Sequence, residues 1–145
     1  MAESDGGVRM ILRHGAGGWD GVPETRYKDE PGTWEGVSRR VLTEGLPCRF
    51  EARCFELAPG GFTSFERHRH VHFVLVLAGR GKVRLGDEWH PVGPMDVVLV
   101  GPDQPHRFLN DGLETMRILC VVDRDRDRDR PVLIDPDSAP GASNE

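Results

Sequence analysis

The stretch of sequence that decides the fold runs from Gly60 to Gly81 and reads GGFTSFERHRHVHFVLVLAGRG. Three of the six histidines lie in it at alternate positions, His68, His70 and His72, directly before the apolar run of residues 73–78. Successive side chains of a strand point to opposite faces, so a regular strand would place all three imidazoles on one face. Imidazole is the commonest protein metal ligand, and its neutral nitrogens suit zinc, iron, nickel or copper. The stretch therefore predicts a metal site beside a buried strand.

A solvated strand edge is the alternative interpretation of these histidines, with Arg67 and Arg69 on the opposite face. A single surface histidine needs no functional explanation. Three at alternate positions favour the metal site, because desolvating several imidazoles together is costly unless something binds them.

Length and composition indicate one domain built from strands. A chain of 145 residues can bury one core, and 18 glycines and 11 prolines with 37% apolar residues favour short strands joined by turns. The net charge of −5 comes from 19 basic and 24 acidic residues mixed along the chain. This mixture argues against nucleic acid or an anionic membrane surface as the main partner.

The three cysteines, Cys48, Cys54 and Cys120, form no Cys-x-x-Cys pair, and no apolar leader precedes a cleavage site. We therefore expect a cytoplasmic protein with reduced thiols. The apolar runs are far shorter than the ~20 residues of a membrane helix, so we also expect a soluble protein.

Period-two patterns predict a series of strands. They are expected at residues 37–42, 49–57, 82–85, 89–92, 96–100, 107–109 and 115–122. In the second of them, Phe50, Ala52 and Cys54 alternate with charged residues that we expect on a half-exposed face, and a turn is expected at 59–61. In the last, one face carries Met116, Ile118, Cys120 and Val122. Strands at this spacing indicate an all-β sandwich or barrel.

The chain divides into three segments. Residues 1–36 form a tail and an irregular arm, whose aromatic residues Trp19, Tyr27 and Trp34 pack on the domain or on a second subunit, or cover one mouth of a cavity. Residues 37–122 form the barrel. Residues 123–145 form a charged, mostly flexible tail that begins with a fourfold Asp-Arg repeat and contains one short candidate edge strand at 131–134.

Two motifs carry a resemblance to a known family. The first consists of Gly61, His68, His70, His72 and Gly79. The second consists of the turn 93–96, the strand 97–100, the proline-containing loop 102–105, His106 and Asn110. In this order and spacing they resemble the two motifs of single-domain cupins of the cupin-2 type. The resemblance implies a double-stranded β-helix, that is, a jelly-roll barrel.

The resemblance also implies a ligand set with one departure from the usual pattern. His72 occupies the position where most cupins have Glu or Gln, so the set resembles the four-histidine cupins: His68, His70, His72 and His106. A straight strand would spread the first three over ~13 Å, too far for one ion bound at ~2.1 Å. A bend at Val71 is therefore required; without it, only three histidines bind and His72 lies outside the set.

Other charged residues have two interpretations each. Glu66 shares the face of the histidines by parity, and we take it as the candidate catalytic residue that orients one of them; a salt bridge to an arginine is the alternative. Arg53 and Arg67 either meet an anionic substrate or lie on a solvated face. His14 and His90 are isolated and predicted to be ordinary surface residues.

The implied function is that of a metal-dependent enzyme. An all-nitrogen site leaves a divalent ion its full charge, which favours an anionic substrate, and free coordination positions favour catalysis. The first hypothesis is oxygenase-like or Lewis-acid chemistry on a small polar or chelating molecule, with Fe or Zn favoured and Mn, Ni or Cu as other candidates. A homodimer is expected, as in many cupins, with no nucleic-acid or membrane partner.

Two further hypotheses stay open. The patterns at 66–72 and 119–124 resemble the zinc-binding cupin units of synthetases that form nitrogen–nitrogen bonds in bacterial natural-product pathways, by a hydrazine-type rearrangement. The other hypothesis is a non-catalytic cupin that binds a small ligand.

Overall fold

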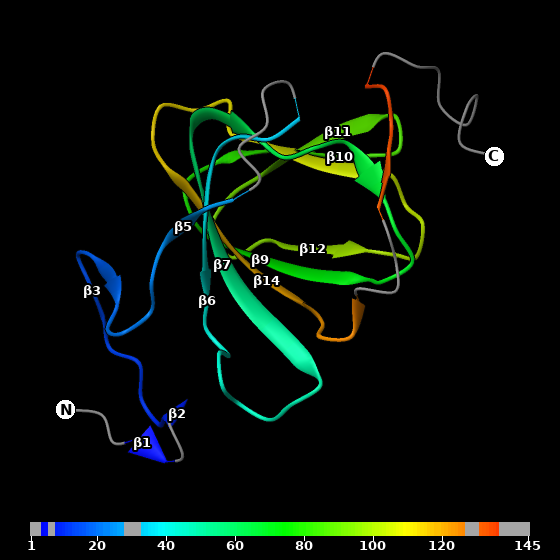
Figure 1. Ribbon diagram of the computed structural model, residues 1–145. Helices are drawn as coiled ribbons and strands as arrows, with labels where there is room; N and C mark the ends of the chain where they lie inside the picture. Colours follow the sequence, from blue (N-terminus) through cyan, green and yellow to red (C-terminus); the bar gives the residue numbers. More distant parts are fainter. Residues whose placement is uncertain (1–3, 6–7, 28–32, 127–130, 137–145) are drawn as a thin grey trace.

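The computed structural model describes residues 4–5, 8–27, 33–126 and 131–136 (Figure 1). These residues form strands and turns and contain no α-helix, which confirms the predicted all-β class. No helix among them is long and apolar enough to cross a membrane.

The strands fall into short arm strands and longer barrel strands. The arm contains β1 (Ser4–Asp5), β2 (Val8–Arg9), β3 (His14–Gly15), β4 (Gly18–Trp19) and β5 (Thr25–Arg26). The barrel contains β6 (Glu35–Val41), β7 (Phe50–Phe62), β8 (Glu66–Arg67), β9 (His72–Ala78), β10 (Gly81–Leu85), β11 (Glu88–Val92), β12 (Val97–Val100), β13 (His106–Leu109), β14 (Met116–Asp123) and β15 (Val132–Leu133).

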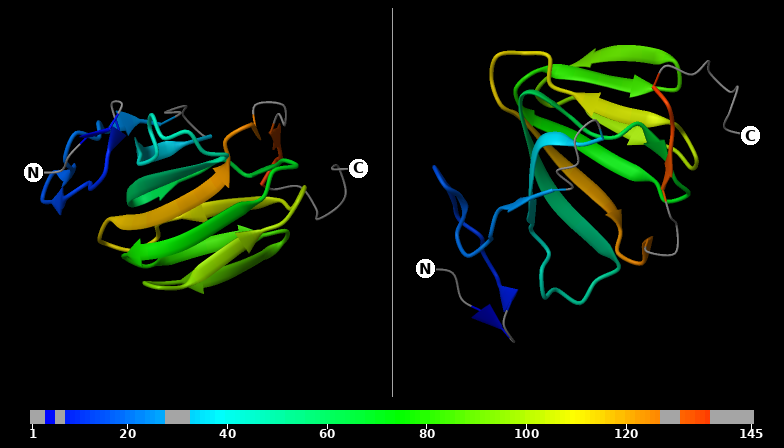
Figure 2. Two further views of the ribbon diagram at one scale, coloured as in Figure 1. Left: turned by 90° about the horizontal axis from the view of Figure 1, so that it is seen from below. Right: turned by 45° about the horizontal axis from the view of Figure 1, so that its top comes forward.

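One antiparallel sheet curls to form the barrel. Its strand order is β11-β10-β13-β7-β14-β9-β12, with β6 also paired to β7 and β8 paired to both β13 and β15. Figures 1 and 2 show two layers, one with β10, β11 and β13 and the other with β9, β12 and β14, while the long strand β7 belongs to both. This is the jelly-roll barrel that the motifs implied.

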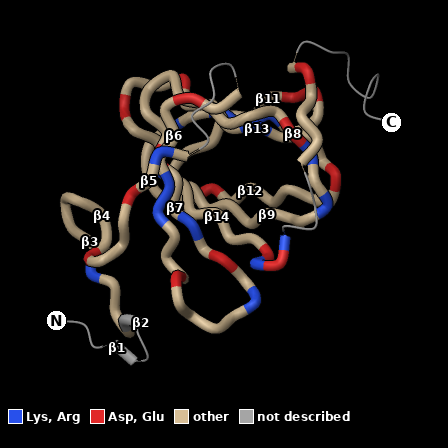
Figure 3. The backbone as a smooth tube through the Cα atoms, in the orientation of Figure 1, with Lys and Arg blue, Asp and Glu red and all other residues tan. Residues whose placement is uncertain are grey.

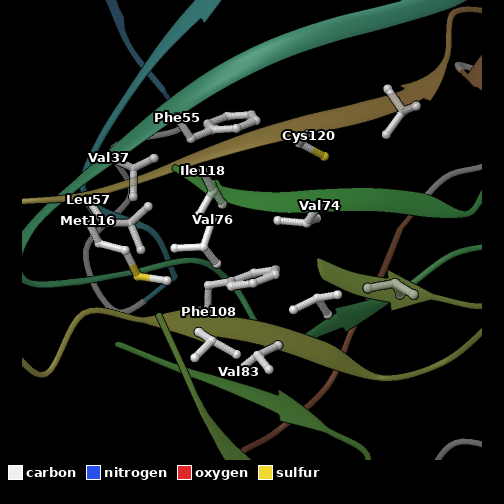
Figure 4. Close-up of a cluster of buried hydrophobic side chains, with 14 of the residues drawn as sticks. Val37, Phe55, Leu57, Val74, Val76, Val83, Phe108, Met116, Ile118 and Cys120 are labelled. Atoms are coloured by element: carbon white, nitrogen blue, oxygen red, sulfur yellow. The ribbon is translucent and has the colours of Figure 1, made fainter. Parts of the chain in front are cut away.

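The hydrophobic core lies between the two layers and fills one end of the barrel (Figure 4). The predicted apolar face of β14 is confirmed, since Met116, Ile118, Cys120 and Val122 are all buried. Leu57 and Met116 are both 0% exposed, and Figure 4 shows them side by side, away from Cys120.

Strand β7 differs from the prediction at its end and in its faces. It continues through the turn expected at 59–61, because Gly60 N–H donates to Asn110 O and Asn110 N–H donates to Gly61 O. Gly60 has φ +82°, a left-handed conformation that glycine adopts without strain. Arg53 was expected on a half-exposed face, but it points inward with Phe55, because β14 pairs with β7 in the register Arg53–Cys120.

The two ends of the chain contact the barrel at defined points. In the arm, Tyr27 packs edge-on against Trp34 and Phe55, with ring centroids 5.0 and 5.1 Å away, whereas Trp19 packs against His14. At the other end, β15 pairs with β8, as expected for the segment 131–134. The predictions of a flexible tail at 1–3, 6–7, 127–130 and 137–145 lie outside the described residues.

Candidate metal centre

A bend in the chain brings the first histidines together. The predicted continuous strand is interrupted between β8 and β9, and the backbone bends at Arg69 and His70, just before Val71, where a bend was required. His68 and His72 therefore face each other, with their Nε2 atoms 3.0 Å apart. The histidines do not share one face of a regular strand, because the strand is interrupted. The side chains of His68 and His72 nevertheless converge, because the chain bends between them.

His106 completes the group from a distant part of the chain. It begins β13 and lies opposite Glu66 of β8 in the sheet register. The metal-binding atoms of His68, His72 and His106 all lie within 4.8 Å of one another. We call these three residues the histidine cluster.

Hydrogen bonds fix the ring tautomers of two cluster members. His68 Nδ1 lies 2.8 Å from the carbonyl oxygen of His70, and His106 Nδ1 lies 2.9 Å from that of Gln104. A carbonyl oxygen only accepts, so each Nδ1 carries the proton and donates it. The Nε2 lone pairs are therefore free to bind an ion, as in metal sites where the second ring nitrogen is held by a backbone carbonyl.

The third member of the cluster is held by a thiol. His72 Nδ1 lies 2.9 Å from Cys120 Sγ, and Cys120 is buried. When His72 Nε2 binds an ion, Nδ1 carries the ring proton and donates it to the sulfur. Sequence reasoning placed Cys120 only in the core, and the alternation along β14 gave no signal for this second contact.

His70, the fourth predicted ligand, takes a different position. Its ring stacks on that of His68, with centroids 3.7 Å apart and an interplanar angle of 3°, and it is not part of the cluster. Its Nδ1 is buried and has no hydrogen-bond partner. The structure thus brings three of the four predicted ligands together, and metal binding by His70 stays a prediction.

Burial keeps all four imidazoles neutral. Desolvation is the largest cause that lowers the pKa of His68, His72 and His106 below the ordinary value of 6.5, and it lowers the pKa of His70 to about 4. The pKa of His72 is lowered further by repulsion from the positive charge that His106 would carry if it were protonated. Neutral imidazole is the form that binds metals, so the cluster is ready to bind at neutral pH.

These shifts predict a pH-dependent stability of the metal-free protein. Between pH 6.5 and about 4 the unfolded chain binds protons that the folded chain does not, so the free energy of unfolding falls as the pH is lowered. The slope is about 1.4 kcal/mol per pH unit for each such histidine. Urea unfolding from pH 7 to 5 should show this loss, and it should be smaller in His70→Ala than in His90→Ala. Equal slopes in both variants would contradict the assignment.

Glu66 stands beside the cluster. Its side chain is buried, Oε2 accepts a hydrogen bond of 2.8 Å from Ser64 Oγ, and Oε1 lies 3.9 Å from His68 Nε2. It is therefore held by a hydroxyl, with its second oxygen directed towards the histidines. Among the described residues no ion pair joins Glu66 to an arginine, and its nearest basic group is the neutral ring of His68.

A cavity of about 330 Å³ opens in front of the cluster. Its polar lining comprises Arg53, Thr63, Ser64, Glu66, His68, His70, His72, His106, Cys120 and Arg126. The remainder of its wall is aromatic or apolar and includes Tyr27, Trp34 and Phe55. This volume accommodates a small molecule with one polar and one apolar side.

Of the other candidates, Arg53 lines this cavity and the rest lie apart from it. Arg53, expected to be half-exposed, is 3% exposed and lines the cavity. Arg67 lies opposite Val132 of β15, and His14 and His90 are exposed, as predicted. The arm partly fulfils its predicted role as a cavity cover, since Tyr27 and Trp34 are part of the cavity wall.

The residues present fit a divalent metal ion. Two nitrogens 3.0 Å apart match neighbouring positions around an ion with bonds of about 2.1 Å, and the neutral, carbonyl-held rings are the donors that such an ion requires. The buried Nδ1 of His70, which has no hydrogen-bond partner, lies outside this group, on a ring stacked against His68.

Comparison with known proteins agrees with the fold. The family model described as "Cupin domain" matches residues 53–122. The chain is 37% identical over 111 residues to a 1-methylthio-D-xylulose 5-phosphate methylsulfurylase of Rhodospirillum rubrum, covering 76% of this chain and 71% of that protein. Among solved structures, it is similar to a cupin 2 conserved barrel domain protein from Rhodopseudomonas palustris, with a TM-score of 0.79. The two sequences are 34% identical, and the match covers 88% of each chain.

A second curated relative is matched over part of its length only. The chain is 33% identical over 90 residues to a probable (S)-ureidoglycine aminohydrolase of Oryza sativa subsp. japonica, covering 61% of this chain but 29% of that protein. The barrel, the paired motifs and the cupin 2 protein that is 34% identical over 88% of each chain lead to one conclusion: the chain belongs to the cupin family.

Proposed function

We propose that the protein is a metal-dependent enzyme that acts on a small polar, metal-chelating molecule by Lewis-acid chemistry. The observation that carries the proposal is the convergence of His68, His72 and His106 on one face of a cavity. A divalent ion bound there would polarise an oxygen of the substrate and stabilise developing negative charge. Three protein ligands leave coordination positions for that substrate.

The chain's own residues supply the remaining functions. Glu66 lies beside His68 with one oxygen anchored by Ser64 and the other directed towards the cluster, so we assign it the role of proton acceptor or donor at the substrate. The carbonyl groups of His70 and Gln104 hold the rings of His68 and His106 in the binding tautomer. The aromatic wall of Tyr27, Trp34 and Phe55 excludes water from the apolar side.

The names of the curated relatives support Lewis-acid chemistry over oxygenation. One is named as a methylsulfurylase of 1-methylthio-D-xylulose 5-phosphate and the other as a probable aminohydrolase of (S)-ureidoglycine, and neither name is that of an oxygenase. The oxygenase-like reaction and the nitrogen–nitrogen bond-forming rearrangement are therefore kept as outcomes of the experiment.

The test is elemental analysis of protein purified without chelators, combined with turnover assays. We expect about one divalent ion per chain, loss of activity on chelation, and turnover of chelating carbonyl or phenolic compounds without oxygen consumption. Stoichiometric oxygen consumption with bound iron would establish an oxygenase instead. Absence of any bound or rebinding metal would overturn the proposal and leave a metal-independent binding protein.

A further inference from the structure

A second polar group lines the same cavity as the histidine cluster. The β7–β14 register pairs Arg53 with Cys120, and Arg53 Nη2 donates to Cys120 Sγ at 3.3 Å. The same sulfur lies 2.9 Å from His72 Nδ1. The Arg53 guanidinium is thus two contacts away from the His72 ring, and both line the same cavity.

The hydrogen-bonding capacity of Arg53 is incompletely used. The residue is 3% exposed, and its buried Nε has no hydrogen-bond partner. Glu51 Oε1 lies 3.7 Å from this nitrogen, close enough for electrostatic attraction but too far for a hydrogen bond. A buried cation with an unmet donor is costly unless a ligand satisfies it. Arg53 also lies over the Phe55 ring at 4.9 Å, which holds its planar group in place.

A second arginine places two guanidinium groups around the single carboxylate of Glu51. Arg126 Nη2 donates to the same Glu51 Oε1 at 2.8 Å, and Arg126 also lines the cavity. One carboxylate is therefore shared by two guanidinium groups, and blue and red segments follow one another along β7 in Figure 3. Glu51 forms its short hydrogen bond with Arg126, so the Nε of Arg53 is left without an acceptor.

We propose that Arg53, assisted by Arg126, binds the oxyanion of a small substrate, a carboxylate or a phosphate, next to the histidine cluster. The guanidinium offers a planar set of donors that matches such a group. The position of this subsite, beside the metal ligands and above Phe55, selects a compact molecule that carries an anionic group a few bonds from its metal-binding oxygen. The link to the metal rests on the proposed function, whereas oxyanion binding by Arg53 does not.

The experiment measures anion binding by the full-length, chelator-treated protein. Isothermal titration calorimetry with inorganic phosphate and, separately, with benzoate shows which oxyanion the subsite prefers. We expect binding of at least one probe at millimolar concentration, and at least about tenfold weaker binding by Arg53→Met, because a charge-assisted, two-point contact is lost. The control is Arg117→Met, which removes an arginine paired with Glu56 on the outer side of β14 and should bind like the wild type.

A second variant keeps the test valid if Arg53→Met does not fold. Glu51→Gln keeps the size of the side chain and removes the charge that competes for both arginines. We expect it to bind the preferred probe several-fold more tightly than the wild type. Circular dichroism and thermal unfolding establish that each variant is folded.

The outcomes separate this inference from the proposed function. Failure of the wild type to bind either probe, or equal binding by the wild type, Arg53→Met and Glu51→Gln, would overturn the oxyanion subsite whatever the metal content. Anion binding that depends on Arg53 in a protein that never binds metal would support the subsite and refute the metal-dependent function.

Discussion

His106→Ala is expected to lower the affinity for the divalent ion by at least about a hundredfold. In metal sites, loss of a residue that only orients a ligand already lowers the metal affinity about 10- to 100-fold. His106 is placed as a ligand itself, so its loss should cost more. His106 is also the member of the cluster that comes from the second motif, so its removal leaves donors from one segment only. Equilibrium dialysis with elemental analysis measures the affinity, and turnover should fall with metal occupancy.

The matched control is His90→Ala. His90 is exposed on β11 and lies 3.6 Å from Glu88, away from the residues that line the cavity. Its removal deletes the same side chain and should leave metal content and turnover unchanged. Equal metal affinity in the two variants would show that His106 is not a ligand.

Gly79→Ala is expected to destabilise the fold by about 3 kcal/mol or more. Gly79 has φ +77°, and a Cβ at this position would lie 2.8 Å from Met116 Cα and even closer to the backbone oxygen of Thr115. Both neighbours belong to the backbone and cannot rotate away. For a chain of this size, the loss should lower the midpoint of thermal unfolding by roughly 10 °C.

Gly86→Ala separates the steric clash from the cost of the backbone conformation. Gly86 has φ +64°, and its added Cβ would meet nothing within 4 Å. The variant should therefore lose only the ~1–2 kcal/mol that a left-handed conformation costs an L-residue. If both alanine variants had the same unfolding temperature, the close approach of Gly79 to β14 would not limit stability.

The fold was predictable because the signals for it are local. The strands can be located from the alternation along 116–122 and from the glycine- and proline-rich turns, without knowledge of which strands pair. The structure confirms that the apolar face of 116–122 is buried. His106 was predicted beside His68 from the order of the two motifs, and the structure brings them together.

The errors come from contacts that depend on the register between distant strands. Alternation along 49–57 places Arg53 and Cys54 on opposite faces of the strand, but it does not show which face points into the barrel. The charge of Arg53 favoured an outward position. The inward position follows from pairing with Cys120, 67 residues away. The same holds for the Cys120–His72 contact. The bend, in contrast, was expected at Val71, and the chain bends at Arg69 and His70.

The most direct test of the central claim is a crystal structure of the metal-loaded protein, with anomalous data collected at the absorption edge of the bound metal. We predict one anomalous peak within about 2.1 Å of the Nε2 atoms of His68, His72 and His106, with at least one coordination position facing the cavity. A peak elsewhere, or an ion fully enclosed by protein ligands, would contradict a catalytic metal centre at this cluster.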